Sequence, residues 1–239
     1  MCTLEQRGRV FVLTLTGDGE HRLGHALIAS FRSAVASAAA QAGPGAALVT
    51  VGEGRFFSNG LDIGWAGNSR ARLRELVDAL RPLAADLLAL PMPTVAAVTG
   101  HASAGGFFLA LCHDYRLMRG DRGVLYMSEV DIGLPLPPYF TAVLRAKITS
   151  ANALRDVALR GKKVRAAEGK EMGIVDAVYP SAAETAAEAF KFAEQLAARK
   201  WDGGVYASIR MSMFPEACRS VGIVEESDEV KRKHFASKL

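Results

Sequence analysis

The chain has 239 residues, of which 50% are apolar and 23% charged, and its net charge is +4. This composition is typical of a globular protein with one sizeable core. The small charge, with no dense run of Lys and Arg among aromatic residues, argues against nucleic-acid binding, and no apolar run is long enough for a membrane span.

Short apolar runs predict β-strands over residues 10–15, 46–51, 94–98, 115–118, 124–127 and 173–178. The first of these is expected to be the second arm of a hairpin. Helices are predicted over residues 26–40, 73–87 and 107–112, and over most of the chain from residue 138 onward. Pro82 lies inside the second helix and should kink or divide it. This order predicts an α/β core at residues 1–180 and a C-terminal helical region at residues 181–239.

Two glycine-rich turns follow predicted strands, at residues 56–62 and 100–106. Gly60 permits a backbone geometry that would leave the N–H of Asn59 pointing outward. The helix expected to begin near Gly105 directs its positive end toward the second turn. Two converging N–H groups can hold a developing negative oxygen, as in an oxyanion hole. Phosphate binding and a simple strand-to-helix connection are the alternatives, although neither phosphate-binding glycine motif is present.

Glu129 follows a strand-like run and is surrounded by apolar residues. Partial burial would raise the pKa of its carboxyl group and make it a better base near neutral pH. Considered alone, a surface glutamate at the end of a strand is the commoner case. Asp131 is the nearest competing acid.

Four motifs in this order resemble the enoyl-CoA hydratase/isomerase (crotonase) superfamily, at residues 57–62, 98–106, 114–115 and 128–129. Residues 161–178 are similar to a later segment of that family, so the resemblance covers about residues 5 to 180. It implies a spiral of β-β-α turns followed by helices used in assembly. It also implies a homotrimer or a dimer of trimers.

The resemblance also implies the roles of individual residues. The backbone N–H groups of Asn59 and Gly105 would form an oxyanion hole around the thioester oxygen of an acyl-CoA substrate. The substrate would be lined by Asn59, Gly60, Leu61, Asp62, Ile63 and Gly105. Hydratases of this family use two glutamates; Glu129 matches one of them, and Phe108 stands at the position of the other.

A single carboxylate can move a proton between two carbons, whereas water addition in this family uses two. The resemblance therefore implies a Δ3,Δ2-enoyl-CoA isomerase, similar to those of plant peroxisomes, in which Glu129 carries the proton. No cofactor or metal is expected, because CoA is part of the substrate and backbone dipoles stabilise the enolate. The alternatives are a 2-enoyl-CoA hydratase, a dienoyl-CoA isomerase, a thioesterase, or a non-catalytic acyl-CoA-binding subunit.

The C-terminal tripeptide consists of Ser237, Lys238 and Leu239. This tripeptide at a free C-terminus is the address read by the peroxisomal import receptor. The three cysteines are odd in number and lack metal-ligand spacing, which favours a reduced compartment. The tripeptide therefore predicts peroxisomal localisation. The alternative is that Ser237, Lys238 and Leu239 simply end a charged helix.

Overall fold

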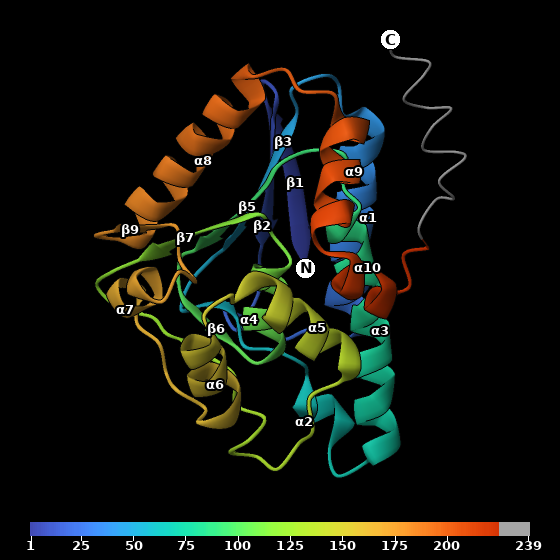
Figure 1. Cartoon of the computed structure of the whole chain (residues 1–239), viewed down its shortest axis with the longest axis vertical. Coiled ribbons are helices and arrows are strands. Elements are labelled where there is room, and N and C mark those ends of the chain that lie inside the picture. The colour runs from blue at the N-terminus through green and yellow to red at the C-terminus, as the bar shows by residue number, and fades with distance from the viewer. Residues whose placement is uncertain (225–239) are drawn as a thin grey trace.

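The structure is a computed structural model, and residues 1–224 are described (Figure 1). Its larger sheet has six strands in the order β1-β2-β3-β5-β7-β9. These are β1 (Cys2–Arg7), β2 (Val10–Leu15), β3 (Ala47–Gly52), β5 (Thr94–Val98), β7 (Tyr115–Arg119) and β9 (Ala177–Tyr179). The predicted hairpin is confirmed, because β1 and β2 are antiparallel, and every other neighbouring pair is parallel.

A second, smaller sheet has the order β4-β6-β8, with all neighbours parallel. Its strands are β4 (Phe56–Ser58), β6 (His101–Ser103) and β8 (Leu125–Tyr126). Each follows a strand of the larger sheet along the chain, so a repeating unit contributes one strand to each sheet before a helix. The expected spiral of β-β-α turns is confirmed. The sequence prediction treated β4 and β6 as parts of turns, which is wrong.

Helices cover both faces of the larger sheet, and the side chains along each strand point alternately to one face and the other. Phe11, Leu13 and Leu48 belong to a core shared with α1 (His25–Gln41), α3 (Arg70–Leu88) and α4 (Gly105–Leu111). Val12 and Val49 face α8 (Ala182–Ala198) instead. Figure 1 shows α8 on one side of the sheet and α1 and α3 on the other. Burial on both faces explains why these strands are continuous apolar runs.

Two sequence predictions about local structure need correction. Pro82 does not divide the helix, because α3 continues through it with Leu80 and Leu83 buried on either side. The strand expected over residues 173–178 is confined to β9. The preceding residues form a turn after α7 (Ala166–Glu171), in which the N–H groups of Ile174 and Val175 donate to the carbonyl of Gly169.

The remaining described helices are α2 (Ile63–Ala66), α5 (Pro138–Lys147), α6 (Ala151–Leu159), α9 (Gly203–Met213) and α10 (Pro215–Val221). Helix α10 packs against α5 and α3. Arg210 anchors α9: its guanidinium donates to both carboxylate oxygens of Asp114, at 2.7 and 2.6 Å, and to the carbonyls of Leu90 and Met92. Within residues 1–224, no helix is long and apolar enough to cross a membrane.

Candidate active site

The two glycine-rich turns lie side by side, because the strands before them, β4 and β6, are paired. Gly60 has a φ of +79°, and a side chain there would place its Cβ 2.8 Å from the carbonyl oxygen of Ser103 and 3.2 Å from the nitrogen of Gly105. A Cβ on Gly106 would lie 2.1 Å from the carbonyl oxygen of Ser58. The glycines therefore allow a close approach of two backbones that side chains would prevent.

The prediction that Asn59 provides a free N–H group is wrong. This group donates to the carbonyl of Glu20 at 2.8 Å. Glu20 lies in the loop before α1, so the contact joins segments far apart in sequence. Asn59 therefore stabilises the turn and is not available to a substrate oxygen.

Leu61 is the residue of the first turn whose N–H remains available. Leu23 pairs with it in a parallel bridge, in which Leu23 donates to the carbonyl of Gly60 and accepts from the N–H of Asp62. In a parallel bridge these flanking groups make the bonds, so the N–H of Leu61 itself points to the other side. It has no acceptor among the residues that the structure describes.

Gly105 supplies the second available N–H. It is the first residue of α4, where the backbone N–H groups have no partner within the helix. A Cβ on Gly105 would lie 3.4 Å from the nitrogen of Leu61, so the two N–H groups are close together. Ala104, the preceding residue, has a φ of +49° and donates its N–H to the carbonyl of Tyr126 at 2.6 Å. This bond holds a strained residue in place.

Glu129 lies near the same edge of the small sheet. Tyr126 of β8 pairs with Ser103 of β6 in a parallel register. From this pair, the segment after β8 leads to Glu129 and the segment after β6 leads to Gly105. The Glu129 side chain is buried, and its Oε2 has no hydrogen-bond partner within the described part of the chain. Burial raises the pKa of the carboxyl group; the N–H groups of Glu129 and Ser128 offset this only in part. This is the environment of a general base.

Phe108 is fully buried one helical turn after Gly105. Its ring stacks on Phe140 with 3.9 Å between centroids and meets Tyr139 edge-on at 5.4 Å. The position at which family hydratases have a second glutamate is therefore part of an aromatic core. Glu129 has no carboxylate partner at this position.

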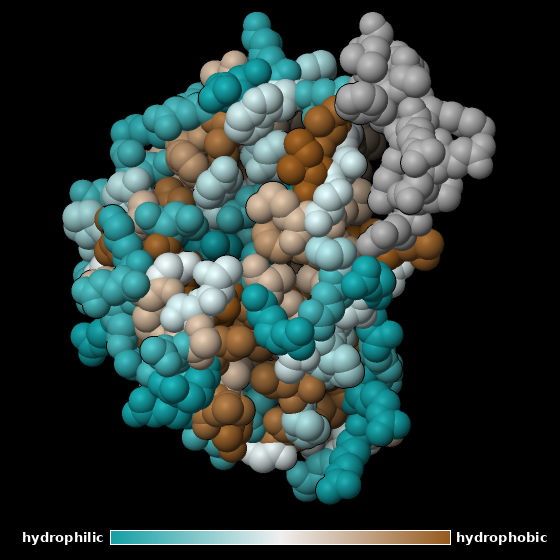
Figure 2. Space-filling view, viewed as in Figure 1, coloured by the Kyte–Doolittle hydropathy of each residue, from teal (hydrophilic) through white to brown (hydrophobic). Residues whose placement is uncertain are grey.

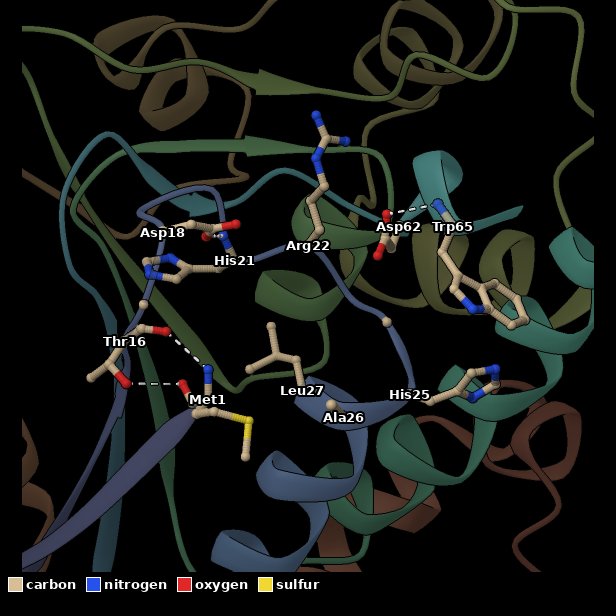
Figure 3. Close-up of a pocket in the computed structure, with 12 residues that line it drawn as sticks. Met1, Thr16, Asp18, His21, Arg22, His25, Ala26, Leu27, Asp62 and Trp65 are labelled. Atoms are coloured by element: carbon tan, nitrogen blue, oxygen red, sulfur yellow. Dashed lines mark hydrogen bonds between the residues drawn. The ribbon is translucent and has the colours of Figure 1, made fainter. Parts of the chain in front are cut away.

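A cavity of about 550 Å³ adjoins the first turn (Figure 3). Of the residues predicted to line the substrate, Asp62 borders this cavity, and its side chain accepts from the N–H of Trp65 at the start of α2. Figure 3 shows Trp65 and His25 facing each other at one end, with His21 toward the other. A volume of this size suits an organic ligand.

Sequence reasoning missed His21, His25 and Trp65 as cavity residues. The sequence feature that could have indicated this cavity is Gly24, because a Cβ at that position would lie 3.3 Å from the Asp62 carboxylate. That glycine lets the loop before α1 approach the first turn. Ile63, the last of the predicted substrate residues, is half exposed at the start of α2 and does not border the cavity.

Comparisons with known proteins agree with this architecture. The family model described as enoyl-CoA hydratase/isomerase matches residues 20–210. The chain is 51% identical to enoyl-CoA delta isomerase 2, peroxisomal, of Arabidopsis thaliana over 93% of this chain and 96% of that protein. It is 50% identical to enoyl-CoA delta isomerase 1, peroxisomal, of the same plant, over 97% of this chain and 98% of that protein.

Solved structures show the same fold. Enoyl-CoA hydratase EchA3 from Mycobacterium ulcerans superposes with a TM-score of 0.84 and 23% identity, covering 98% of this chain and 99% of that one. The Mtb enoyl-CoA isomerase gives a TM-score of 0.84 with 21% identity, covering 100% and 98%. The chain belongs to the enoyl-CoA hydratase/isomerase family and has the crotonase fold.

Proposed function

We propose that this protein is a Δ3,Δ2-enoyl-CoA isomerase, which converts 3-enoyl-CoA to trans-2-enoyl-CoA in the β-oxidation of unsaturated fatty acids. The observation that carries the proposal is a single buried carboxylate, Glu129, beside two available backbone N–H groups, with Phe108 at the place of a second acid. The names of the Arabidopsis relatives support the same reaction.

In the proposed mechanism, the thioester oxygen accepts hydrogen bonds from the N–H groups of Leu61 and Gly105. The carboxylate of Glu129 removes a proton from C2, and the negative charge spreads over a dienolate whose oxygen the two N–H groups stabilise. Glu129 then returns the proton to C4. The double bond moves from C3 to C2, and the enzyme is restored without water, cofactor or metal.

The cavity beside Asp62 is the proposed location of the CoA portion. Arg22 and His25 border it and could contact phosphate groups, although Arg22 also pairs with Glu20 at 2.7 Å. The acyl group would extend from the oxyanion hole toward Glu129. Gly60 and Leu61 then lie between the CoA and acyl portions.

The experiment that tests this proposal compares two substrates and one variant. Purified protein should isomerise 3-enoyl-CoA and leave 2-enoyl-CoA unhydrated, and Glu129→Gln should lower kcat by about 10²–10⁴-fold, the usual contribution of a general base. Hydration of 2-enoyl-CoA, or near-normal isomerisation by Glu129→Gln, would contradict the assignment. Tight binding of acyl-CoA without turnover would favour a non-catalytic subunit.

Assembly as a homotrimer or dimer of trimers is part of the proposal. Helix α9 carries the exposed apolar side chains Val205, Ile209 and Met213, and Figure 2 shows hydrophobic surface near this helix. Exposed apolar patches of this kind mark interaction surfaces. Light scattering should give the mass of three or six chains, whereas Ile209→Asp should lower it; a monomeric wild-type protein would contradict the proposal.

We also propose that the protein is imported into peroxisomes. Ser237, Lys238 and Leu239 lie outside the described residues, and the support is the tripeptide itself together with the peroxisomal relatives. A fluorescent protein fused to the N-terminus of the full chain should appear in peroxisomes, and deletion of the tripeptide should leave it in the cytosol. Unchanged import after the deletion would contradict this role.

A further inference from the structure

Tyr126 contacts both halves of the proposed active site. Its carbonyl accepts the N–H of Ala104 at 2.6 Å, directly before the oxyanion-hole residue Gly105. Its side-chain hydroxyl donates a hydrogen bond to Oδ2 of Asp131, two residues after Glu129. One residue at the end of β8 therefore joins the strand that leads to the oxyanion hole to the loop that carries the base.

The loop over residues 128–134 has internal bonds that do not fix it to the sheet. Asp131 donates its N–H to the carbonyl of Ser128 at 3.0 Å, and Leu134 donates to the carbonyl of Glu129 at 2.9 Å. Both bonds stay within the loop. The hydrogen bond from Tyr126 to Asp131 instead connects the loop to the strand across five positions.

Residues 161–164 pack against both Tyr126 and Asp131 and support the hydrogen bond between them. A Cβ on Gly161 would lie 2.7 Å from Oδ2 of Asp131, so the backbone at that position, with a φ of +56°, lies against the carboxylate. Lys163 places its Nζ 5.0 Å from the centroid of the Tyr126 ring. Val164 exchanges two backbone hydrogen bonds with Leu125, at 2.8 and 2.9 Å.

The position of the Glu129 carboxylate depends on this loop. Its Oε2 has no partner within residues 1–224, and the N–H groups that lower its pKa belong to Glu129 itself and to Ser128. Because the hydrogen bonds to this carboxylate come from its own loop, a shift of the loop shifts the carboxylate as well. Since a misplacement of about 1 Å can cost a large factor in rate, the anchoring of the loop bears directly on catalysis.

We propose that Tyr126 and Asp131 are positioning residues, which hold Glu129 opposite the N–H groups of Leu61 and Gly105. Asp131 acts through the Tyr126 hydroxyl and does not exchange a proton with the substrate. This inference rests on the proposed isomerase function. It assigns a role to the acid that otherwise competes with Glu129 as a second catalytic carboxylate.

The test uses the full-length protein and the variants Tyr126→Phe, Asp131→Ala and Asp131→Asn. Loss of one hydrogen bond should lower kcat about fivefold in Tyr126→Phe and in Asp131→Ala, with KM changed less than twofold. Asp131→Asn keeps an oxygen that accepts from the tyrosine hydroxyl, so it should retain most of the activity. Tyr179→Phe on β9 is the matched control and should behave like the wild type.

The double variant Tyr126→Phe/Asp131→Ala separates positioning from independent effects. If the two residues act through one bond, its kcat should equal that of either single variant. A multiplicative loss would overturn the proposal, and so would equal damage by Asp131→Asn and Asp131→Ala, which would assign the charge itself to the chemistry. Because Asp131 is exposed, its variants should fold even if Tyr126→Phe does not.

Glu129→Gln distinguishes failure of this inference from failure of the proposed function. If Glu129→Gln is inactive while Tyr126→Phe and Asp131→Ala match the wild type, positioning by Tyr126 is wrong and the isomerase assignment stands. If Glu129→Gln is fully active, the proposed function fails first.

Discussion

A methyl group at position 105 should slow catalysis strongly without disturbing the fold. In Gly105→Ala the new Cβ would lie 3.4 Å from the nitrogen of Leu61, 3.5 Å from Cδ1 of Leu23 and 3.6 Å from Cα of Gly60. These are ordinary van der Waals distances, so the core can accept the methyl. The same methyl occupies space beside the N–H of Leu61, where the thioester oxygen would bind. Loss of one oxyanion-hole donor costs about 10²–10³-fold in kcat, or ~3 kcal/mol of transition-state stabilisation.

Two matched glycines make this measurement specific. Gly43→Ala should change nothing, because within residues 1–224 no atom beyond Gly43 and its two chain neighbours lies within 4 Å of the new Cβ. Gly106→Ala should destabilise the fold, because its Cβ would lie 2.1 Å from the carbonyl oxygen of Ser58. Initial rates with 3-enoyl-CoA and thermal unfolding midpoints are measured for all three variants. A Gly105→Ala protein with kcat within threefold of the wild type would refute the oxyanion hole at Leu61 and Gly105.

Three further predictions concern the base, the C-terminal anchor and the helix proline. Burial raises the pKa of Glu129 above that of an ordinary glutamate. As the pH falls, kcat/KM should therefore begin to drop at a pH above that ordinary pKa, because the base becomes protonated. A drop that begins only at the ordinary pKa of a glutamate would contradict this. Arg210→Met removes the ion-pair partner of the buried Asp114 and should lower the free energy of unfolding by about 3–5 kcal/mol in urea titrations; a loss under ~1 kcal/mol would show that the pair is dispensable. Pro82→Ala restores a helical N–H donor and should stabilise the protein by about 1–3 kcal/mol with unchanged activity; a lower urea midpoint would mean that the proline serves another purpose.

Local sequence signals predicted the elements that carry most of the fold. The apolar runs that become β2, β3 and β5 are buried on both faces, so composition alone marks them as strands. The strands β4 and β6 have only three residues each and lie inside glycine-rich turns. Their pairing depends on a partner far away in the chain, which no local pattern reveals.

The sequence prediction located the two turns but assigned the available N–H group of the first turn to the wrong residue. The glycines at 60 and 105 indicated two backbones that approach each other, and the structure brings them together. Which N–H group is available depends on hydrogen bonds that the turn makes with Glu20 and Leu23, and these residues belong to a loop that sequence reasoning did not place beside the turn. The roles of Tyr126 and Asp131 were hidden for the same reason, because their bond is made by side chains on a folded loop.

The contacts of Arg210 have a consequence for the synthesis of the chain. The guanidinium satisfies the carbonyl of Leu90, 120 positions earlier, and the carboxylate of Asp114, 96 positions earlier. Until residue 210 has left the ribosome, the Leu90 carbonyl and Oδ1 of Asp114 lack the donor that Arg210 provides, although Thr94 already donates to Oδ2 of Asp114. We therefore expect the two sheets to form early during translation, and the contacts of α9 with Leu90 and Asp114 to form last. The nascent chain should then reach its full stability only when α9 has been made.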